Sequence, residues 1–345
     1  MPLPITLMHF WNAGALLAAV FALSFLITGR VRRYAQGRLL DVPNDRSSHQ
    51  APTPRGGGLA IVLAFALGLL VSSAAGWLSG QSLAFLTGGL MVAAVGFWDD
   101  HGHVPARWRM LAHVLAAVLA VYGMGGMAVL WVNGQTVALG WAGPVLAVVF
   151  IAWMLNLFNF MDGIDGIAAG EALSVAASAA GLSLWFQPDT RLWLAYALLA
   201  MAASGFLLWN WPPARIFMGD VGSGFLGFML GVFALAGGAG GGLSLVVWLI
   251  LTGVFVVDAS FTLAIRMISG QRWYEAHRSH AYQKASRVLG GHKPVTLRVL
   301  LINGVWLLPL AALAAARPEL ELGVLLLAYL PLLILAACLG AGRAS

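Results

Sequence analysis

The sequence predicts an all-α polytopic membrane protein, with about eleven transmembrane helices in a single domain that spans residues 1–345. Hydrophobic residues make up 60% of the chain and charged residues only 9%, and the mean hydropathy is +0.86. Soluble globular proteins carry about 25% charged residues, so this composition excludes a soluble domain. One membrane span needs roughly 20 apolar residues, and the chain has room for about ten to twelve spans.

Eleven apolar runs divide the chain. The first has no basic residue before it, so we interpret it as a retained span and not as a removed signal peptide. An odd number of spans places the two termini on opposite sides of the membrane. The runs cover residues 10–29, 57–77, 82–98, 110–129, 144–158, 167–186, 192–209, 224–239, 243–265, 296–316 and 322–340.

The basic residues predict the orientation. With the N-terminus outside and the C-terminus inside, all 19 lysines and arginines except Arg191 and Arg317 fall in cytoplasmic segments, as the positive-inside rule requires. Because orientation explains the net charge of +6, we expect no nucleic-acid partner. The predicted cytoplasmic active-site loops lie near residues 30–56, 99–109, 159–166, 210–223 and 266–295.

On the predicted outer side, the chain contains one candidate hairpin. Residues 129–139 read VLWVNGQTVAL, with two β-prone runs on either side of Asn133 and Gly134. An Asn-Gly pair between such runs is typical of a tight hairpin turn. We therefore expect a small periplasmic β-hairpin near 129–139.

The polar residues gather in a few cytoplasmic segments. In NLFNFMDGIDGIAAGEA (156–172), Asp162 and Asp165 are three residues apart beside glycines, a turn that can hold a metal ion or a phosphate. GFWDD ends the third span with Asp99 and Asp100. Two adjacent carboxylates suit a divalent cation or a shared proton, although a solvated helix end would look the same. The nearby basic residues His101, His103, Arg107 and Arg109 favour a polyanion site.

The segment NWPPARIFMGDVGSG (210–224) places Asp220 among glycines at the start of a helix. A carboxylate there is a common helix cap. The three glycines go beyond what a cap needs, and they would let backbone amides approach a phosphate. Phe217 could pack against lipid or stack on a flat base, and its chemistry leaves both open.

Two other loops supply donors for anions. The loop DVPNDRSSHQAPTPRGGG contains Arg46, His49 and Arg55, although attraction to the membrane surface would also explain them. In WYEAHRSHAYQKASR, His277, Arg278 and His280 form a cluster suited to phosphate oxygens. Zinc is disfavoured because no third protein ligand is near.

Asp258 is predicted to lie inside the ninth span, about 12 Å below the helix end near Arg266. A carboxylate at that depth suggests a functional intramembrane acid. A structural hydrogen bond to a neighbouring helix explains it nearly as well.

Taken in order, these segments resemble the polyprenyl-phosphate N-acetylhexosamine-1-phosphate transferases, of glycosyltransferase family 4 type. Members link a sugar-1-phosphate from a UDP-sugar to a membrane lipid phosphate. Five ordered motifs from Asp41 to His280 make the resemblance specific. They are DVPNDRSSH with PTPRGGG, GFWDD, NLFNFMDGIDGIAAG, NWPPARIFMGDVGSG and HRSHAYQ.

The resemblance implies roles for the residues of these motifs. Asp99 and Asp100 would be the catalytic pair and Asp220 a magnesium ligand, with the pair as further metal candidates. Phe217 would contact uracil, and Asn210 would be a pocket amide. The expected substrate-binding set is Asn159, Asp162, Asp165, Asn210, Phe217, Arg46, His49, Arg55, His277, Arg278 and His280.

The resemblance also implies cofactor, partners and location. We expect Mg²⁺, with Mn²⁺ as an alternative, a UDP-sugar donor, undecaprenyl phosphate as acceptor, and a bacterial inner membrane with the site facing the cytoplasm. A homodimer is left open. The triple histidine of the peptidoglycan-precursor branch is absent, and His101 and His103 replace a basic residue often found after the aspartate pair. We therefore expect the O-antigen or another surface-glycan initiating branch.

In such a reaction the lipid phosphate attacks the sugar-bearing β-phosphorus and UMP leaves. An aspartate could take the proton from the lipid phosphate, or attack first to form an acyl phosphate, and the sequence leaves both open. A cation- or proton-coupled transporter is the main alternative, with Asp258 and the acid pairs carrying ions. The opening D-x-x-D-G at Asp162 also matches the CDP-alcohol phosphotransferases, but their continuation is missing.

Overall fold

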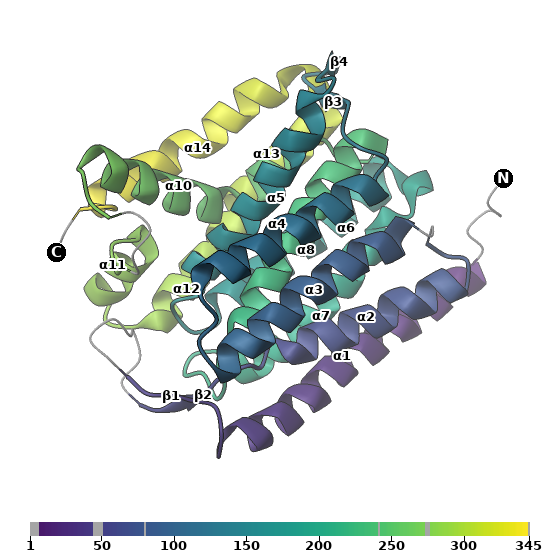
Figure 1. Cartoon of the computed structure of the whole chain (residues 1–345). Helices are drawn as coiled ribbons and strands as arrows, with labels where there is room; N and C mark the ends of the chain where they lie inside the picture. Colours follow the sequence, from purple (N-terminus) through teal and green to yellow (C-terminus); the bar gives the residue numbers. More distant parts are fainter. Residues whose placement is uncertain (1–6, 44–50, 79–80, 241, 273–276, 344–345) are drawn as a thin grey trace.

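The computed structural model describes residues 7–43, 51–78, 81–240, 242–272 and 277–343 of the chain. It is built almost entirely from helices, with two very small sheets (Figure 1). The α-helices are α1 (Leu7–Ala35), α2 (Leu59–Ala74), α3 (Gln81–His101), α4 (Ala106–Gly123), α5 (Ala142–Met161), α6 (Ile167–Phe186), α7 (Leu192–Asn210), α8 (Asp220–Gly240), α9 (Leu245–Leu251), α10 (Gly253–Ile268), α11 (Ala281–Val288), α12 (His292–Ile302), α13 (Leu308–Ala316) and α14 (Glu321–Cys338). Short helical turns at Pro188–Thr190, Asn303–Leu307 and Pro318–Leu320 connect some of them.

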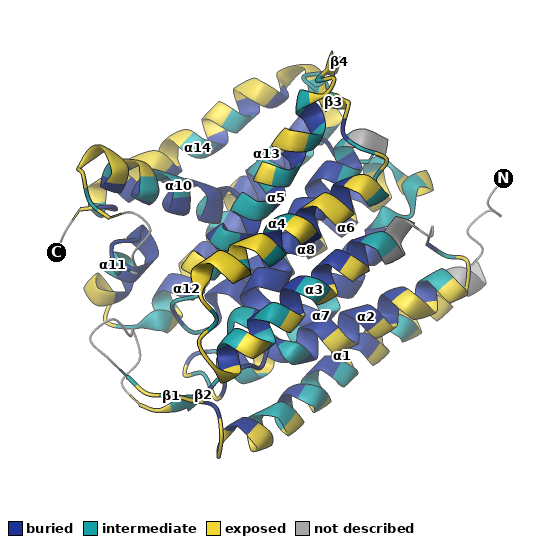
Figure 2. Ribbon diagram, in the orientation of Figure 1, coloured by how far each residue is buried: buried dark blue, intermediate teal, exposed yellow. Residues whose placement is uncertain are grey.

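Helix α8 lies at the centre of the molecule. It packs against α3 and α5 and is buried along almost its whole length (Figure 2). Its Phe233 makes edge-on or tilted ring contacts with Phe65 of α2, Tyr196 of α7 and Trp248 of α9. Such pairs add to the stabilisation that burial of aromatic surface provides. The apolar core therefore fixes the direction of α8 and, with it, the position of its first residue.

The other helices surround α8. Helices α1, α2 and α7 pack on one another at one flank, and α10 and α14 pack together at the other (Figure 1). Large apolar side chains remain exposed on the outer helices, including Leu326, Leu330 and Ile334 of α14. Such a surface suits a lipid environment, because hydrocarbon chains solvate it as well as the protein core does.

The predicted helical class is confirmed, and each of the eleven apolar runs lies mostly on helix. The expected count of eleven spans is not. Among the described residues, seven helices are long and apolar enough to cross a membrane, or eight if the pair α9–α10 is one span bent by 83°. Helix α2 is apolar but has only 16 residues, which is short for a membrane span.

The predicted hairpin is confirmed. Strands β3 (Val129–Val132) and β4 (Gln135–Ala138) pair antiparallel around Asn133 and Gly134, whose φ angles are 53° and 74°. The buried Glu321 carboxylate accepts hydrogen bonds from the backbone N–H of Asn133 and from Ser244 Oγ. This carboxylate, to which the sequence suggested no role, therefore anchors the hairpin to α9 and α14.

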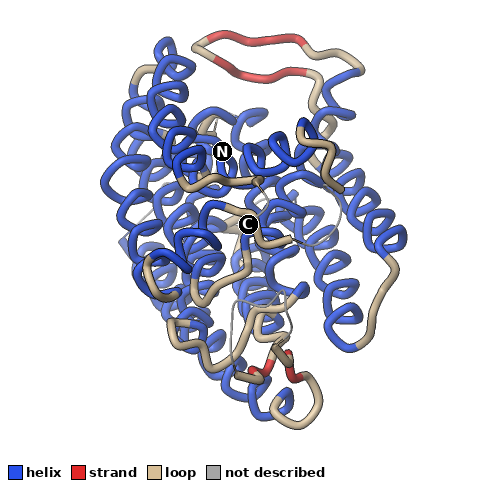
Figure 3. The backbone as a smooth tube through the Cα atoms, turned by 90° about the vertical axis from the view of Figure 1, so that its left-hand side faces the viewer, coloured by secondary structure: helices blue, strands red, loops and turns tan. Residues whose placement is uncertain are grey.

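A second sheet lies at the opposite end of the molecule from the hairpin (Figures 1 and 3). Strands β1 (Leu40–Asp41) and β2 (Thr53–Pro54) pair antiparallel within the first predicted cytoplasmic loop. The N–H of Phe217, in the loop before α8, donates to the carbonyl of Pro54 at 2.8 Å. This end of the fold therefore brings the first loop to the start of the central helix.

The close packing of α3 on α8 gives a test of this arrangement. A Cβ added at Gly96 would lie 2.5 Å from the carbonyl oxygen of Asp220 and 2.6 Å from the nitrogen of Val221. Both atoms are backbone, so Gly96→Ala should push the two helices apart and lower the free energy of unfolding by about 1–3 kcal/mol. Thermal unfolding of the detergent-solubilised protein measures this. Gly102→Ala is the control, because nothing lies within 4 Å of its added Cβ, and equal melting of both variants would contradict the packing.

Candidate active site

The site begins where the C-terminal end of α3 meets the first turn of α8. Asp100 is buried, and its carboxylate accepts hydrogen bonds from the backbone N–H groups of Asp220 at 3.1 Å and Val221 at 3.3 Å. These are among the helix N–H groups that have no partner within their own helix. Asp100 thus caps α8 from another helix. Gly219, at φ 75°, leaves room for it, since a Cβ there would lie 2.4 Å from Asp100 Oδ2.

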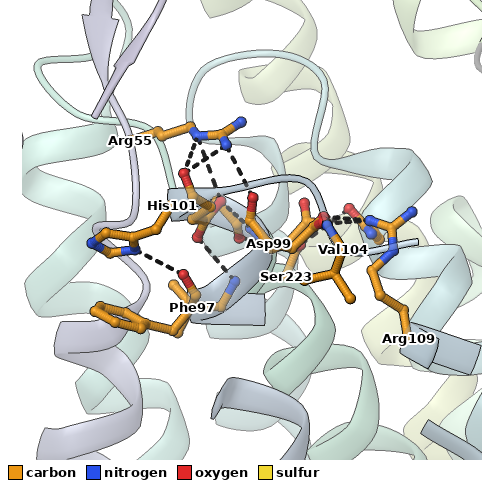
Figure 4. A network of polar contacts seen from close by, with 12 residues as sticks. Arg55, Phe97, Asp99, His101, Val104, Arg109 and Ser223 are labelled. Atoms are coloured by element: carbon orange, nitrogen blue, oxygen red, sulfur yellow. Dashed lines mark hydrogen bonds and ion pairs between the residues drawn. The ribbon is translucent and has the colours of Figure 1, made fainter. Parts of the chain in front are cut away.

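Arg55 holds the other side of Asp100. Its guanidinium donates to the backbone carbonyls of Asp99 at 3.3 Å and Asp100 at 2.7 Å, and Nε lies 3.7 Å from Asp100 Oδ1 (Figure 4). A cation at a helix C-terminus is favourable, because the last carbonyls carry partial negative charge. Arg55, predicted to bind substrate, is therefore part of the structure that fixes the end of α3.

The carboxyl of Asp100 has a raised pKa. Burial raises the pKa of its carboxyl to about 6, while the two backbone N–H groups and Arg55 favour the charged form and oppose the rise. It lies beyond the apolar run of α3, at the predicted cytoplasmic end.

Asp99 points into a different environment from its neighbour. It accepts a hydrogen bond from the N–H of Val104 at 2.8 Å. Its Oδ2 lies 2.5 Å from Arg109 Nη1, and the same nitrogen lies 3.0 Å from Asp220 Oδ2 (Figure 4). One guanidinium nitrogen from α4 thus joins the carboxylates of α3 and α8.

Asp162 lies in the loop between α5 and α6 and faces the same cluster. Burial raises the pKa of its carboxyl well above the usual value, and the charges of Asp220, Asp100 and Asp165 raise it further. Within the described part of the chain, no group donates a hydrogen bond to this carboxylate or forms an ion pair with it. A partly exposed carboxylate facing other acids is suited to a cation.

Asn159 lies on the same wall. Its side-chain oxygen accepts a hydrogen bond from Ser223 Oγ, in the first turn of α8, at 3.3 Å. The predicted site residues Asn159, Asp162, Asp99, Asp100 and Asp220 therefore gather around one helix terminus.

The side chains of Asp165 and Asn210 connect the 162–166 loop to the segment before α8. Asp165 accepts from the N–H of Ala214 at 3.0 Å, and its Oδ1 lies 3.1 Å from His292 Nδ1. Asn210 accepts from the N–H of Gly166 at 3.0 Å and donates to the carbonyl of Ile216 at 2.9 Å. Both side chains bond mainly to backbone, so they hold the 162–166 loop against the segment before α8.

The remaining predicted pocket residues are placed less centrally. Phe217 is partly exposed, and its carbonyl accepts from the N–H of Gly57 at 2.9 Å. Arg46 and His49 lie outside the described residues.

Asp258 and the histidine loop form a separate cluster. The Asp258 carboxylate accepts from the backbone N–H groups of Ala281 and Tyr282, both at 2.9 Å, and lies 3.2 Å from His280 Nδ1. Asp258 therefore caps α11 from α10. The predicted hydrogen bond to a neighbouring helix is confirmed, and the functional role of this acid stays a prediction.

The loop that contains His277 packs on this cap. His277 stacks on His280 with ring centroids 4.9 Å apart, and its Nδ1 lies 3.0 Å from Ser279 Oγ. Burial, together with the neighbouring His280 and Arg266, lowers the pKa of His277 to about 4, so it is neutral at physiological pH. Arg278 is partly exposed, and its carbonyl accepts from Arg287.

One tyrosine connects this cluster to the carboxylate cluster. Tyr282 Oη donates to the carbonyl of Phe160 at 3.0 Å, and a Cβ at Gly163 would lie 2.1 Å from that oxygen. The histidine loop therefore rests directly against the loop that contains Asp162.

Sequence reasoning missed several contacts. His292 pairs with the Asp165 carboxylate, and Thr296 Oγ1 donates to the backbone carbonyl of Asp165 at 2.8 Å. Neither His292 nor Thr296 lies in a motif near Asp165. Arg109 was noted only as one of four basic neighbours, and no spacing in the sequence links it to Asp220.

The carboxylates do not form a complete protein cage for a metal. In the described ranges, no group of three or more His, Cys, Asp or Glu side chains is arranged to hold an ion. Magnesium commonly needs only one or two carboxylates, with waters and substrate phosphates completing its shell. Asp99 and Asp220, brought together on one nitrogen, and the unpaired Asp162 fit that smaller requirement.

Comparisons with known proteins cover the part of the chain that contains this site. The model of glycosyl transferase family 4 matches residues 82–238, which include Asp99, Asp162 and Asp220. A phospho-N-acetylmuramoyl-pentapeptide-transferase of Synechococcus elongatus is 30% identical over 279 residues, covering 71% of this chain and 69% of that protein. The chain belongs to the polyprenyl-phosphate N-acetylhexosamine-1-phosphate transferase family.

Other members of this transferase family align over more of the chain. A probable undecaprenyl-phosphate N-acetylglucosaminyl 1-phosphate transferase of Bacillus subtilis is 28% identical over 322 residues, covering 91% of this chain and 88% of that protein. A decaprenyl-phosphate N-acetylglucosaminephosphotransferase of Mycolicibacterium smegmatis is 28% identical, covering 82% of this chain and 77% of that protein. The resemblance drawn from five motifs is thus confirmed.

The Asp258 cap gives a test of how the histidine loop is held. Asp258→Asn replaces one acceptor oxygen by an NH₂ group, so at least one buried N–H loses its partner, at about 1–3 kcal/mol. Amide hydrogen exchange of residues 280–284 should accelerate, while exchange in α8 should not change. Thr262→Val is the control, because it removes only the hydroxyl that donates to Asp258 at 3.1 Å. Unchanged exchange in Asp258→Asn would contradict the capping role.

Proposed function

We propose that this protein transfers an N-acetylhexosamine-1-phosphate, or a related sugar-1-phosphate, from a UDP-sugar to undecaprenyl phosphate and releases UMP. The observation that carries the proposal is the convergence of Asp99, Asp100, Asp162 and Asp220 on the N-terminus of α8. These residues come from three separate sequence motifs. If the four side chains had faced separate compartments, they could not have acted together in one reaction.

The relatives support the choice of substrates. Two relatives that cover most of the chain are named as N-acetylglucosaminyl 1-phosphate or N-acetylglucosaminephosphotransferases acting on polyprenyl phosphates. We therefore propose UDP-N-acetylglucosamine as the first donor to assay. We further propose that the product initiates a lipid-linked O-antigen or other surface glycan.

The proposed cofactor is Mg²⁺, with Mn²⁺ as an alternative. Asp99 and Asp220 would hold it, with Asp162 on the open side and substrate phosphates completing the shell. When bound, it would offset the negative charge of the diphosphate and of the group being transferred.

The residues of the chain suit a direct displacement. Both reactants are anions, so Arg109 would help to offset their repulsion. The lipid phosphate has a second pKa of about 6 and is largely ionised at neutral pH, so it needs little help from a base.

The two adjacent aspartates are placed for different tasks. Asp100 is buried, with both oxygens bonded to backbone N–H groups, and is poorly placed to attack phosphorus. Asp99, at the open side, is the better candidate for contact with the acceptor. This division favours the direct route over an acyl phosphate on Asp100.

The transporter alternative loses its main support. It relied on Asp258 as an ion carrier inside the membrane, and that carboxylate is engaged by α11.

We also propose the orientation that the basic residues predict. The N-terminus lies outside the bacterial inner membrane, the β3–β4 hairpin lies in the periplasm, and the carboxylate cluster faces the cytoplasm. The positions of the two sheets at opposite ends of the molecule support this assignment (Figure 3).

The reaction is tested by incubating the purified protein with undecaprenyl phosphate, Mg²⁺ and UDP-N-acetylglucosamine or other UDP-N-acetylhexosamines. UMP release should depend on all three components and stop when EDTA removes the metal. Asp220→Asn should lose at least about a hundredfold in turnover, because it removes a charge at the transfer site. Asp189→Asn, on an exposed turn, should behave as wild type. Absence of UMP release from every donor would refute the function.

The orientation is tested by cysteine labelling. Cys338 is the only cysteine and is exposed, so Cys338→Ser provides a cysteine-free background. Gln135→Cys in the hairpin should react with a membrane-impermeant maleimide on spheroplasts. Lys293→Cys, on the opposite side by our assignment, should react only after lysis. The reverse pattern would show that the orientation is inverted.

A further inference from the structure

Arg109 occupies the point between two of the proposed metal-binding carboxylates. Its Nη1 lies 2.5 Å from Asp99 Oδ2 and 3.0 Å from Asp220 Oδ2, and its side chain is 29% exposed (Figure 4). Two carboxylate oxygens that share one nitrogen can be no further apart than the sum of these distances. Without a cation between them they would repel each other strongly in a partly buried site.

Arg109 is held differently from Arg55, the other arginine of the site. Arg55 donates to the carbonyls at the end of α3 and pairs with a carboxylate that is only 2% exposed. Every hydrogen bond that the Arg109 side chain makes to the described residues goes from Nη1 to a carboxylate. Its partners are also more accessible, at 11% for Asp99 and 30% for Asp220. Arg55 is anchored to backbone, whereas Arg109 depends on the two acids alone.

A divalent cation at Asp99 and Asp220 would compete directly with this guanidinium. Magnesium binds its oxygen ligands at about 2.0–2.1 Å, and Nη1 approaches the same two oxygens. The guanidinium would then have to leave at least one of them. A diphosphate offers it oxygen acceptors that match its planar donor geometry.

We propose that Arg109 is a displaceable counter-cation: it holds Asp99 and Asp220 together, yields them to the divalent metal, and transfers its guanidinium to a phosphate of the UDP-sugar. This inference rests on the proposed function for the identity of metal and nucleotide. Arg109 is then a positioning residue for the metal and a direct ligand of the donor.

The proposal predicts a coupling between metal and nucleotide. The metal must displace Arg109, and this displacement is easier when a phosphate is present to receive the guanidinium. By linkage, each ligand then tightens the binding of the other by the same factor. Loss of Arg109 should therefore shift the two affinities in opposite directions, which a purely structural role would not do.

The test measures binding and not turnover. Calorimetry on the full-length protein in detergent gives the affinity for Mn²⁺ alone, and then the affinity for UMP in the presence of Mn²⁺. In Arg109→Gln the two carboxylates lose their competitor, so Mn²⁺ alone should bind tighter by about five- to tenfold, the size of a typical coupling. UMP should bind weaker by about tenfold, because a charge-assisted donor to its phosphate is lost.

Two further variants control for charge and fold. Arg317→Gln removes an equal charge from an exposed ion pair with Glu319 and should leave both affinities within about twofold of wild type, as expected for a screened surface charge. Arg109→Lys keeps a cation at the bridge but lacks the planar fork. Its Mn²⁺ affinity should stay near wild type while UMP binds more weakly.

Unchanged or weaker Mn²⁺ binding in Arg109→Gln would overturn the proposal. A parallel loss of both affinities would also overturn it, since Arg109 would then only maintain the geometry of the site. If Arg109→Gln unfolds, Arg109→Lys still decides, because full UMP affinity in that variant would refute a guanidinium contact. Turnover of the wild-type protein is measured separately. If the wild type releases no UMP but Arg109→Gln still shifts the two affinities in opposite directions, the proposed function is refuted and the role of Arg109 is not.

Discussion

The cap that Asp100 places on α8 is the interaction on which the rest of the site depends. It joins the end of one helix to the start of another through two backbone N–H groups. The direction of α8 is already fixed by the apolar core, and the cap fixes where α3 ends relative to it. Asp220 and Asp99 then face each other because each is the neighbour of a residue in this contact. The position of Asp99 and Asp220 is therefore a consequence of helix capping more than of any property of those two acids.

This arrangement explains why two adjacent acids can coexist at the edge of a hydrophobic protein. A carboxylate removed from water is strongly destabilised unless hydrogen bonds and opposite charge replace its hydration. Asp100 receives two N–H groups and Arg55, and Asp99 receives one N–H group and Arg109. Each acid has its own arginine, one anchored and one accessible. The pair thus combines a buried carboxylate with a more accessible one.

Much of the fold could be predicted from the sequence, because it follows from local patterns. Apolar runs set the helices, and Asn133-Gly134 set the hairpin turn. The count of spans could not be obtained in this way, since an apolar run does not show whether its helix is long and straight enough to cross. The run at 57–77 forms a helix of only 16 residues, and the run at 243–265 forms two helices bent by 83°. The five motifs located the acids correctly at one end of the molecule. Their roles remain predictions, and Arg46 and His49 lie outside the described residues.

The contacts that tie distant segments together were not predictable from one sequence. His292 meets Asp165 across more than a hundred residues, and Asp258 caps a helix that begins at Ala281. Such pairings depend on how loops pack, and the sequence around one partner does not indicate the other. Asp258 is an example: an acid inside an apolar run suggested ion transport, and the structure places it at the start of α11, where it accepts two backbone N–H groups. Arg109 is the opposite case, an ordinary basic residue after a helix start whose importance appears only with both carboxylates in view.

The same physical principle governs both ends of the cytoplasmic surface. At α8 and at α11, a carboxylate from another helix satisfies the first N–H groups of a helix and so fixes its starting point. The two caps are connected, since Tyr282 follows the second cap and bonds to the carbonyl of Phe160, beside Asn159 of the first cluster. A rigid scaffold of this kind holds charges close together without letting them relax apart. Close, unrelaxed negative charge favours a divalent cation, because binding of the cation relieves repulsion that the fold has already imposed.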